Sequence, residues 1–80
     1  MCGIIGITSN KTVSAAIINS LKKLEYRGYD SAGVATIYDG VIKEVKSEGR
    51  VENLEQNSLI KSLEGTVGIG HVRWATHGVP

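Results

Sequence analysis

The sequence predicts one small α+β domain, in which an antiparallel sheet is covered by helices on one face and by a second sheet on the other. Three observations lead to this prediction. Short stretches rich in β-branched residues occur near both ends and in the middle of the chain. Stretches with helical periodicity separate them. Two of the expected strands are apolar on both faces, so both faces require cover.

The first part of the chain predicts a strand and an amphipathic helix. Cys2–Ile7 is apolar and is followed by a turn-forming Thr, Ser and Asn, which is typical of a strand. A helix is expected from about residue 12 to 24, with Asn10 or Thr12 as its N-cap. Its expected buried stripe consists of Val13, Ala16, Ile17, Leu21 and Leu24, and its expected solvent face of Asn19, Lys22 and Lys23.

The middle of the chain predicts a β-hairpin. Its strands are Gly33–Tyr38 and Val41–Lys46, joined by Asp39 and Gly40. An Asp-Gly pair tolerates the positive φ angles of a type I′ turn, so it favours a two-residue connection. The second strand alternates apolar and charged residues, which indicates that one of its faces or edges meets solvent.

The last part predicts a helix and a final strand. Residues 51–63 have helical spacing with a break expected near Asn57 and Ser58, and Gly65 is expected to end this segment. Thr66–Trp74 returns to a strand pattern. Alternation places Val67, Ile69, His71 and Arg73 on one face of it. Residues 75–80 are expected to be a loop.

Composition and charge exclude several classes of function. The chain has 80 residues, a net charge of +1 and no basic run, so nucleic acid is not an expected partner. Its apolar runs are far shorter than the roughly 20 residues that cross a bilayer, so no membrane partner is expected. No secretory leader is visible and the single cysteine cannot form an internal disulfide, which favours the cytoplasm.

Cys2 is a candidate nucleophile because of its position. Removal of Met1 would place a thiol and a free α-amine on one residue. An α-amine with a pKa of about 7.7 to 8.0 can take the thiol proton, so one residue can serve as nucleophile and base. The alternative is a small apolar residue that starts a strand. Gly3 and Gly6 would allow another backbone or a substrate to approach closely.

Two further stretches are dense in functional groups. Glu25–Gly33 (EYRGYDSAG) contains Arg27 and Asp30, which could also form an ordinary surface ion pair. Gly68–Gly78 (GIGHVRWATHG) contains an arginine whose planar fork suits a carboxylate, followed by Thr76 and His77 as further donors. Neither a compact zinc pattern nor a P-loop spacing is present. His71 is expected to be a core histidine.

Together, CGIIG at Cys2–Gly6, LEYRGYDSAG at Leu24–Gly33 and GIGHVRWATHG at Gly68–Gly78 resemble the glutaminase domain of class II glutamine amidotransferases. The resemblance covers the whole chain. The second and third stretches are typical of the glucosamine-6-phosphate synthase family, the isomerising glutamine:fructose-6-phosphate amidotransferases, rather than of the purine branch.

The resemblance implies an N-terminal nucleophile hydrolase fold, with two antiparallel sheets between helical layers (αββα). It implies that Cys2 attacks the side-chain amide of L-glutamine, forms a thioester and releases ammonia. Arg73 would bind the α-carboxylate of glutamine, Trp74, Thr76 and His77 would line that pocket, and Arg27 and Gly3 would lie near the nucleophile. A sugar isomerase region in the rest of the synthase would use the ammonia without a metal or organic cofactor, and the full-length protein would be a homodimer.

The family pattern also continues past Pro80, with an Asn-Gly pair that holds the oxyanion and an acidic residue for the substrate amine. Residues 1–80 are therefore expected to be a partial glutaminase domain with little activity by itself. Two alternatives stay open from the sequence: a segment that binds glutamine or glutamate without catalysis, and one that a partner chain completes.

Overall fold

The computed structural model describes residues 3–25 and 30–73 of the chain. The elements follow the predicted order, with the second helical segment divided in two. They are β1 (Gly3–Thr8), α1 (Ser14–Leu24), β2 (Ser31–Tyr38), β3 (Val41–Glu48), α2 (Val51–Gln56), the 3-10 helix η2 (Ser58–Ser62) and β4 (Val67–Arg73). The predicted break at Asn57 is confirmed.

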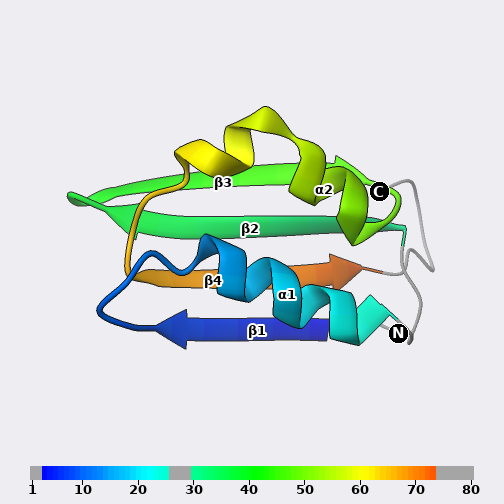
Figure 1. Cartoon of the computed structure of the whole chain (residues 1–80), viewed down its shortest axis with the longest axis horizontal. Helices are drawn as coiled ribbons and strands as arrows, with labels where there is room; N and C mark the ends of the chain where they lie inside the picture. Colours follow the sequence, from blue (N-terminus) through cyan, green and yellow to red (C-terminus); the bar gives the residue numbers. More distant parts are fainter. Residues whose placement is uncertain (1–2, 26–29, 74–80) are drawn as a thin grey trace.

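The four strands form one antiparallel sheet in the order β1-β4-β2-β3. The first and last strands along the chain are therefore neighbours. Both α-helices lie on the same face of this sheet, α1 over β1 and β4 and α2 over β2 and β3 (Figure 1). The predicted hairpin is confirmed as β2 and β3, with φ angles of 51° at Asp39 and 75° at Gly40. Its second strand is an edge strand, as its alternating pattern indicates.

The core lies between the sheet and the helices. α1 approaches β4 closely because Gly68 and Gly70 face it: a Cβ at Gly68 would lie 2.9 Å from Ile17 Cδ1, and one at Gly70 would collide with Ile17 Cγ2. The fully buried side chains come from α1 and the residue just before it, and from α2, β2 and β4. The largest are Ile17, Leu21, Leu54, Val13, Val34, Val51 and Val72.

Two predictions for α1 are wrong in detail. Neither Asn10 nor Thr12 caps the helix, because its N-cap position is Val13 and no side chain accepts a hydrogen bond from its first turn. Ala16 is exposed, whereas Ile18 is buried. The reason is that α1 contacts α2 as well as the sheet. The apolar stripe therefore extends toward α2. The prediction had assumed that the helix packs against a sheet alone.

Neither of the described α-helices lies on the other face of the sheet (Figure 1). Large apolar side chains on this open face are exposed, among them Ile4 at 79%, Ile42 at 70% and Ile69 at 57%. Of the four predicted layers, the described residues form one helical layer and one sheet. The predicted second sheet is not among them, because all four described strands join the same sheet.

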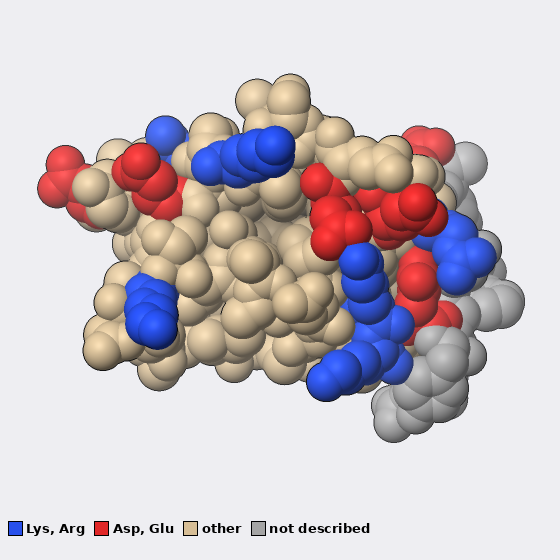
Figure 2. Space-filling model, in the orientation of Figure 1, with Lys and Arg blue, Asp and Glu red and all other residues tan. Residues whose placement is uncertain are grey.

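The helix-covered face carries interspersed charges of both signs (Figure 2). One of its ion pairs joins Lys22 Nζ of α1 to Glu55 Oε1 of α2 at 2.7 Å. None of the described helices has the length and apolarity needed to cross a membrane.

Candidate functional site

Three segments meet at one end of the sheet, on the right in Figure 1. β1 begins there with Gly3, β2 begins with Ser31 and β4 ends with Arg73. The strand register places Gly3 opposite Val72 and Ser31 opposite Arg73. The Asp30 N–H donates a hydrogen bond of 2.8 Å to the Arg73 carbonyl. Each of these strands carries part of one of the three motifs. The fold therefore brings the starts of β1 and β2 close to the end of β4.

A hollow of about 300 Å³ opens at this end of the sheet. Its walls come from β2, β3 and β4, and its lining residues are Ser31, Ala32, Lys46, Ser47, Glu48, His71 and Arg73. Ligand pockets for small molecules typically begin at about this size. The lining combines two cationic side chains, a carboxylate and hydroxyl groups, which suits a small polar or zwitterionic molecule.

His71 lies within this hollow because Gly33 leaves room for its ring. The two residues face each other across β2 and β4, and Lys46 is opposite Gly33 on β3. A Cβ on Gly33 would lie 2.6 Å from His71 Nε2 and 3.2 Å from Lys46 Cγ. A side chain at position 33 would therefore displace the imidazole. Gly33 of the LEYRGYDSAG motif thus determines where the side chain of His71, in the GIGHVRWATHG motif, lies.

The surroundings of the His71 imidazole favour its neutral form. Its pKa is lowered from the usual 6.5, first by burial and then by the positive charge of Lys46. Glu44 opposes this effect and Arg73 adds to it. The expectation of a core histidine is wrong: His71 is half-buried on the open face. The reason is the alternation of β4, which turns His71 and Arg73 to the side away from the helices.

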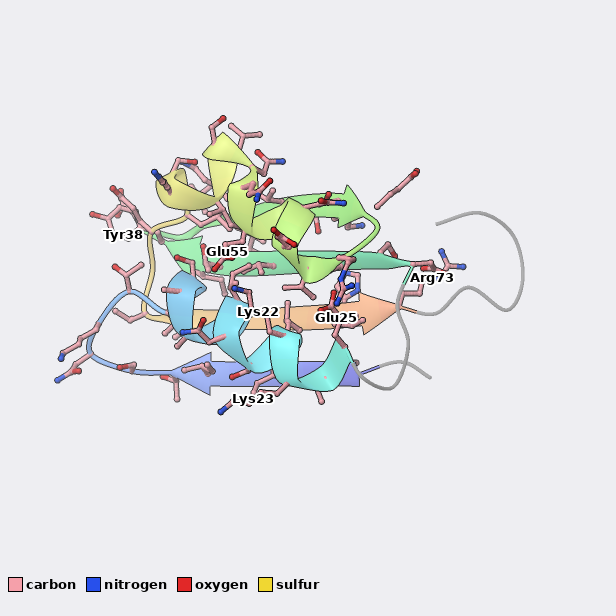
Figure 3. All side chains as sticks on the ribbon, turned by 45° about the vertical axis from the view of Figure 1, so that its right-hand side comes forward. Lys22, Lys23, Glu25, Tyr38, Glu55 and Arg73 are labelled. Atoms are coloured by element: carbon pink, nitrogen blue, oxygen red, sulfur yellow. The ribbon has the colours of Figure 1, made fainter. Side chains whose placement is uncertain are left out.

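Glu25, the first residue of the EYRGYDSAG stretch, has a carboxylate that makes two polar contacts near this end of the sheet. Its Oε2 accepts a hydrogen bond of 2.7 Å from the N–H of Val51, the first residue of α2. Its Oε1 lies 3.6 Å from the guanidinium of Arg50. The Glu25 side chain is only 12% exposed. It therefore connects the end of α1 to the start of α2 (Figure 3).

Two of the predicted site residues are described. Arg73 lines the hollow from the end of β4. Gly3 starts β1, and a Cβ there would lie 2.9 Å from Leu24 Cδ1, so the close approach at Gly3 is made by a side chain of α1. The other predicted residues, Cys2, Arg27, Trp74, Thr76 and His77, lie outside the described residues, and their roles stay predictions.

Sequence reasoning missed Lys46, Glu48 and Ser31 as lining residues. Ser31 belongs to a motif, but Lys46 and Glu48 belong to an ordinary charged strand that gives no functional signal. They reach the hollow only because β3 pairs with β2 along its whole length. Among residues 3–25 and 30–73, no group of three or more His, Cys, Asp or Glu side chains is placed to hold a metal ion.

The chain is similar in sequence to curated proteins of several bacteria. It is 56% identical to glutamine–fructose-6-phosphate aminotransferase [isomerizing] of Mesorhizobium japonicum over 80 residues, which is 100% of this chain and 13% of that protein. The protein of the same name from Rhizobium meliloti is 55% identical over 80 residues. The one from Bartonella quintana is 53% identical over 79 residues, which is 99% of this chain. The chain thus spans 13% of the length of these relatives. No family model matches it.

Two solved structures share the fold. One is described as the allosteric regulatory enzyme of purine biosynthesis, with a TM-score of 0.84 and 26% identity over 95% of this chain and 16% of that one. The other is glutamine phosphoribosylpyrophosphate amidotransferase from B. subtilis, complexed with ADP and GMP. It also gives a TM-score of 0.84 and 26% identity, over 100% of this chain and 18% of that one.

The fold matches that of a class II glutamine amidotransferase. Within that class, identity is much higher to the isomerising aminotransferases than to the phosphoribosyl enzyme. The chain is homologous to the glutaminase domain of the glutamine–fructose-6-phosphate aminotransferase family, also called glucosamine-6-phosphate synthases. The sequence-based assignment to the glucosamine branch is confirmed.

Proposed function

We propose that this chain provides the nucleophile and part of the glutamine pocket of a glutaminase. In the full-length protein, the released ammonia would serve the synthesis of glucosamine 6-phosphate from fructose 6-phosphate. The observation that carries the proposal is the position of Arg73. It lines a small polar hollow between β2, β3 and β4, and it directly follows Val72, which pairs with Gly3 at the start of β1. Cys2 directly precedes this strand in the sequence.

The proposed reaction uses two groups of one residue. The α-amine of Cys2, freed by removal of Met1, takes the thiol proton, and the thiolate attacks the side-chain amide carbon of glutamine. The C–N bond breaks, the leaving nitrogen takes the proton, and ammonia and a γ-glutamyl thioester result. Water then hydrolyses the thioester to glutamate and regenerates the thiol. No redox or metal step is needed for this balance.

Substrate binding in this proposal depends on Arg73. A guanidinium can donate two parallel hydrogen bonds to a carboxylate, which fixes both the position and the orientation of the amino acid. The backbone of Arg73 is held by the hydrogen bond from the Asp30 N–H and by strand pairing with Ser31. Trp74, Thr76 and His77 follow directly in the sequence and are proposed to complete the pocket, with Arg27 near the nucleophile.

The wider setting is proposed from the relatives. The partners would be L-glutamine and the sugar isomerase region of the synthase, in a cytoplasmic homodimer. The exposed isoleucines of the open sheet face support a further layer over that face, as in the αββα arrangement, because exposed apolar patches mark contact surfaces.

The test is Cys2→Ala in the full-length protein. Glutamine-dependent synthesis should be abolished, while sugar isomerisation should continue because it uses a different site. Cys2→Ser should also be severely impaired, since a hydroxyl is much harder to deprotonate than a thiol. A Cys2→Ala enzyme that still hydrolyses glutamine would overturn the assignment.

A second candidate function is binding of glutamine or glutamate without catalysis. The hollow and Arg73 favour it, because both are present in the described residues without any contribution from the nucleophile. A binding isotherm with L-glutamine, together with failure of a reactive glutamine analogue to label Cys2, would favour this candidate over the glutaminase.

A further inference from the structure

The proposed glutaminase assigns no role to His71, although its ring lies in the same hollow as Arg73. We propose that His71 is a second binding residue for the α-carboxylate of the amino-acid ligand, acting beside Arg73. This inference rests on the proposed function and names a further residue of the same site.

The first support is strand geometry. His71 and Arg73 are two positions apart on β4, so their side chains leave the same face about 6.6 Å apart along the strand. A carboxylate has two oxygens and about four acceptor sites, which can be shared between a guanidinium and an imidazole N–H. Both side chains line the same hollow, so both border the space in which a small anion would bind.

The second support is the space that Gly33 provides for the ring. A side chain at position 33 would occupy the position of His71 Nε2, as its 2.6 Å approach shows. Gly6 lies on the same open face, but a Cβ there would have no neighbour nearer than 3.9 Å. The close approach at Gly33 therefore reflects the histidine and the stem of Lys46, and not the tightness of the sheet in general. Gly6 thus offers a matched control.

The third support is the charge around the ring. The charges that act on His71 are those of Lys46 and Glu44 of β3 and Arg73 of β4, and the carboxylate of Glu48 lines the same hollow. Burial and the two cations lower the pKa of the imidazole in the free protein. A carboxylate bound in the hollow would add a negative charge beside it and raise its pKa. By linkage, protonation of His71 must then tighten carboxylate binding by the same factor.

The sign of the pH effect follows. The free-state pKa of His71 is lowered from 6.5, and a bound carboxylate would raise it above the free-state value. Affinity for the carboxylate should therefore rise as the pH falls through this interval, and become constant below it. Each pKa unit added by the ligand corresponds to about a tenfold change in Kd.

The experiment measures the Kd of L-glutamine by calorimetry between pH 5 and pH 8. The protein is the full-length chain with Cys2→Ala, which prevents turnover. Binding should be about threefold or more tighter at the low end, as expected for a pKa difference of half a unit or more. His71→Gln and Gly33→Ala, added separately, should remove this pH-dependent increment, whereas Gly6→Ala should retain it. 4-Aminobutanamide is glutamine without its α-carboxylate, and its binding should show no such pH-dependent gain in affinity.

Each outcome is informative. The same pH-dependent increment in the His71→Gln protein, or with 4-aminobutanamide, would overturn the role of His71 while leaving the glutamine site in place. Loss of the increment in Gly6→Ala as well would show that it reports general disturbance of the sheet, and would also overturn the inference. No glutamine binding by the parent protein at any pH would overturn the proposed function itself, and this inference with it.

Discussion

Replacement of Glu25 by alanine should destabilise the domain more than its modest ion pair suggests. The carboxylate is 12% exposed and accepts the Val51 N–H at 2.7 Å. Hydrogen bonds to charged groups contribute about 1.5–3 kcal/mol. The contact with Arg50, at 3.6 Å and with a side chain 61% exposed, adds less than about 1 kcal/mol. We therefore expect the free energy of unfolding to fall by about 2 kcal/mol, almost all of it from the hydrogen bond.

The loss should be concentrated at the start of α2. This helix has six residues and cannot form by itself, so its first N–H depends on the carboxylate. The assay combines denaturant unfolding of the full-length protein with hydrogen exchange of the segment containing Val51. Glu25→Gln, which keeps an acceptor oxygen but not the charge, should lose less stability than Glu25→Ala.

The matched control is Glu55→Ala. Glu55 pairs with Lys22 at 2.7 Å, but both side chains are more than two-fifths exposed, at 43% and 42% (Figure 3). Exposed pairs contribute about 0–1 kcal/mol, so this substitution should have a small effect. Equal losses for Glu25→Ala and Glu55→Ala, or unchanged exchange at Val51, would refute the reasoning.

Two further predictions concern the pocket and the helix–sheet contact. Arg73→Lys keeps the charge but cannot form two parallel hydrogen bonds, so steady-state kinetics should show a raised KM for glutamine at an unchanged melting temperature. An unchanged KM with a lower melting temperature would show that Arg73 stabilises the fold and does not bind the substrate. Gly70→Ala should destabilise the domain by about 1–3 kcal/mol, because the new Cβ would collide with Ile17 and lie 3.2 Å from Leu21. Gly6→Ala, with no close neighbour, should change stability by less than about 1 kcal/mol, and similar losses for both would contradict this account.

The elements were predictable because each depends on local pattern. The Asp39–Gly40 turn determines its hairpin, and the alternation of β4 correctly predicted that His71 and Arg73 share a face. The face of a strand, however, does not reveal what covers it. His71 was expected in the core, whereas it lies on the face away from the helices.

The remaining features depend on contacts between distant segments. The Glu25–Val51 hydrogen bond joins residues 26 positions apart, and the space for His71 requires β2 to lie between β3 and β4. Neither leaves a periodic signal in the sequence. The motifs predicted Arg73 as a substrate-binding residue, a role that stays a prediction although its side chain lines the hollow. Lys46 became a candidate only when the pairing of β2 with β3 was known.

The most direct test of the central claim is the site of covalent labelling by a reactive glutamine analogue. The full-length protein, treated with 6-diazo-5-oxo-L-norleucine and digested, should yield one modified N-terminal peptide. Its mass should show that it begins at Cys2, without Met1, and that the label is on the thiol. Excess L-glutamine should protect it. Labelling of a different residue, or of Cys2 with Met1 still attached, would contradict the claim that Cys2 is the nucleophile and that its own α-amine is the base.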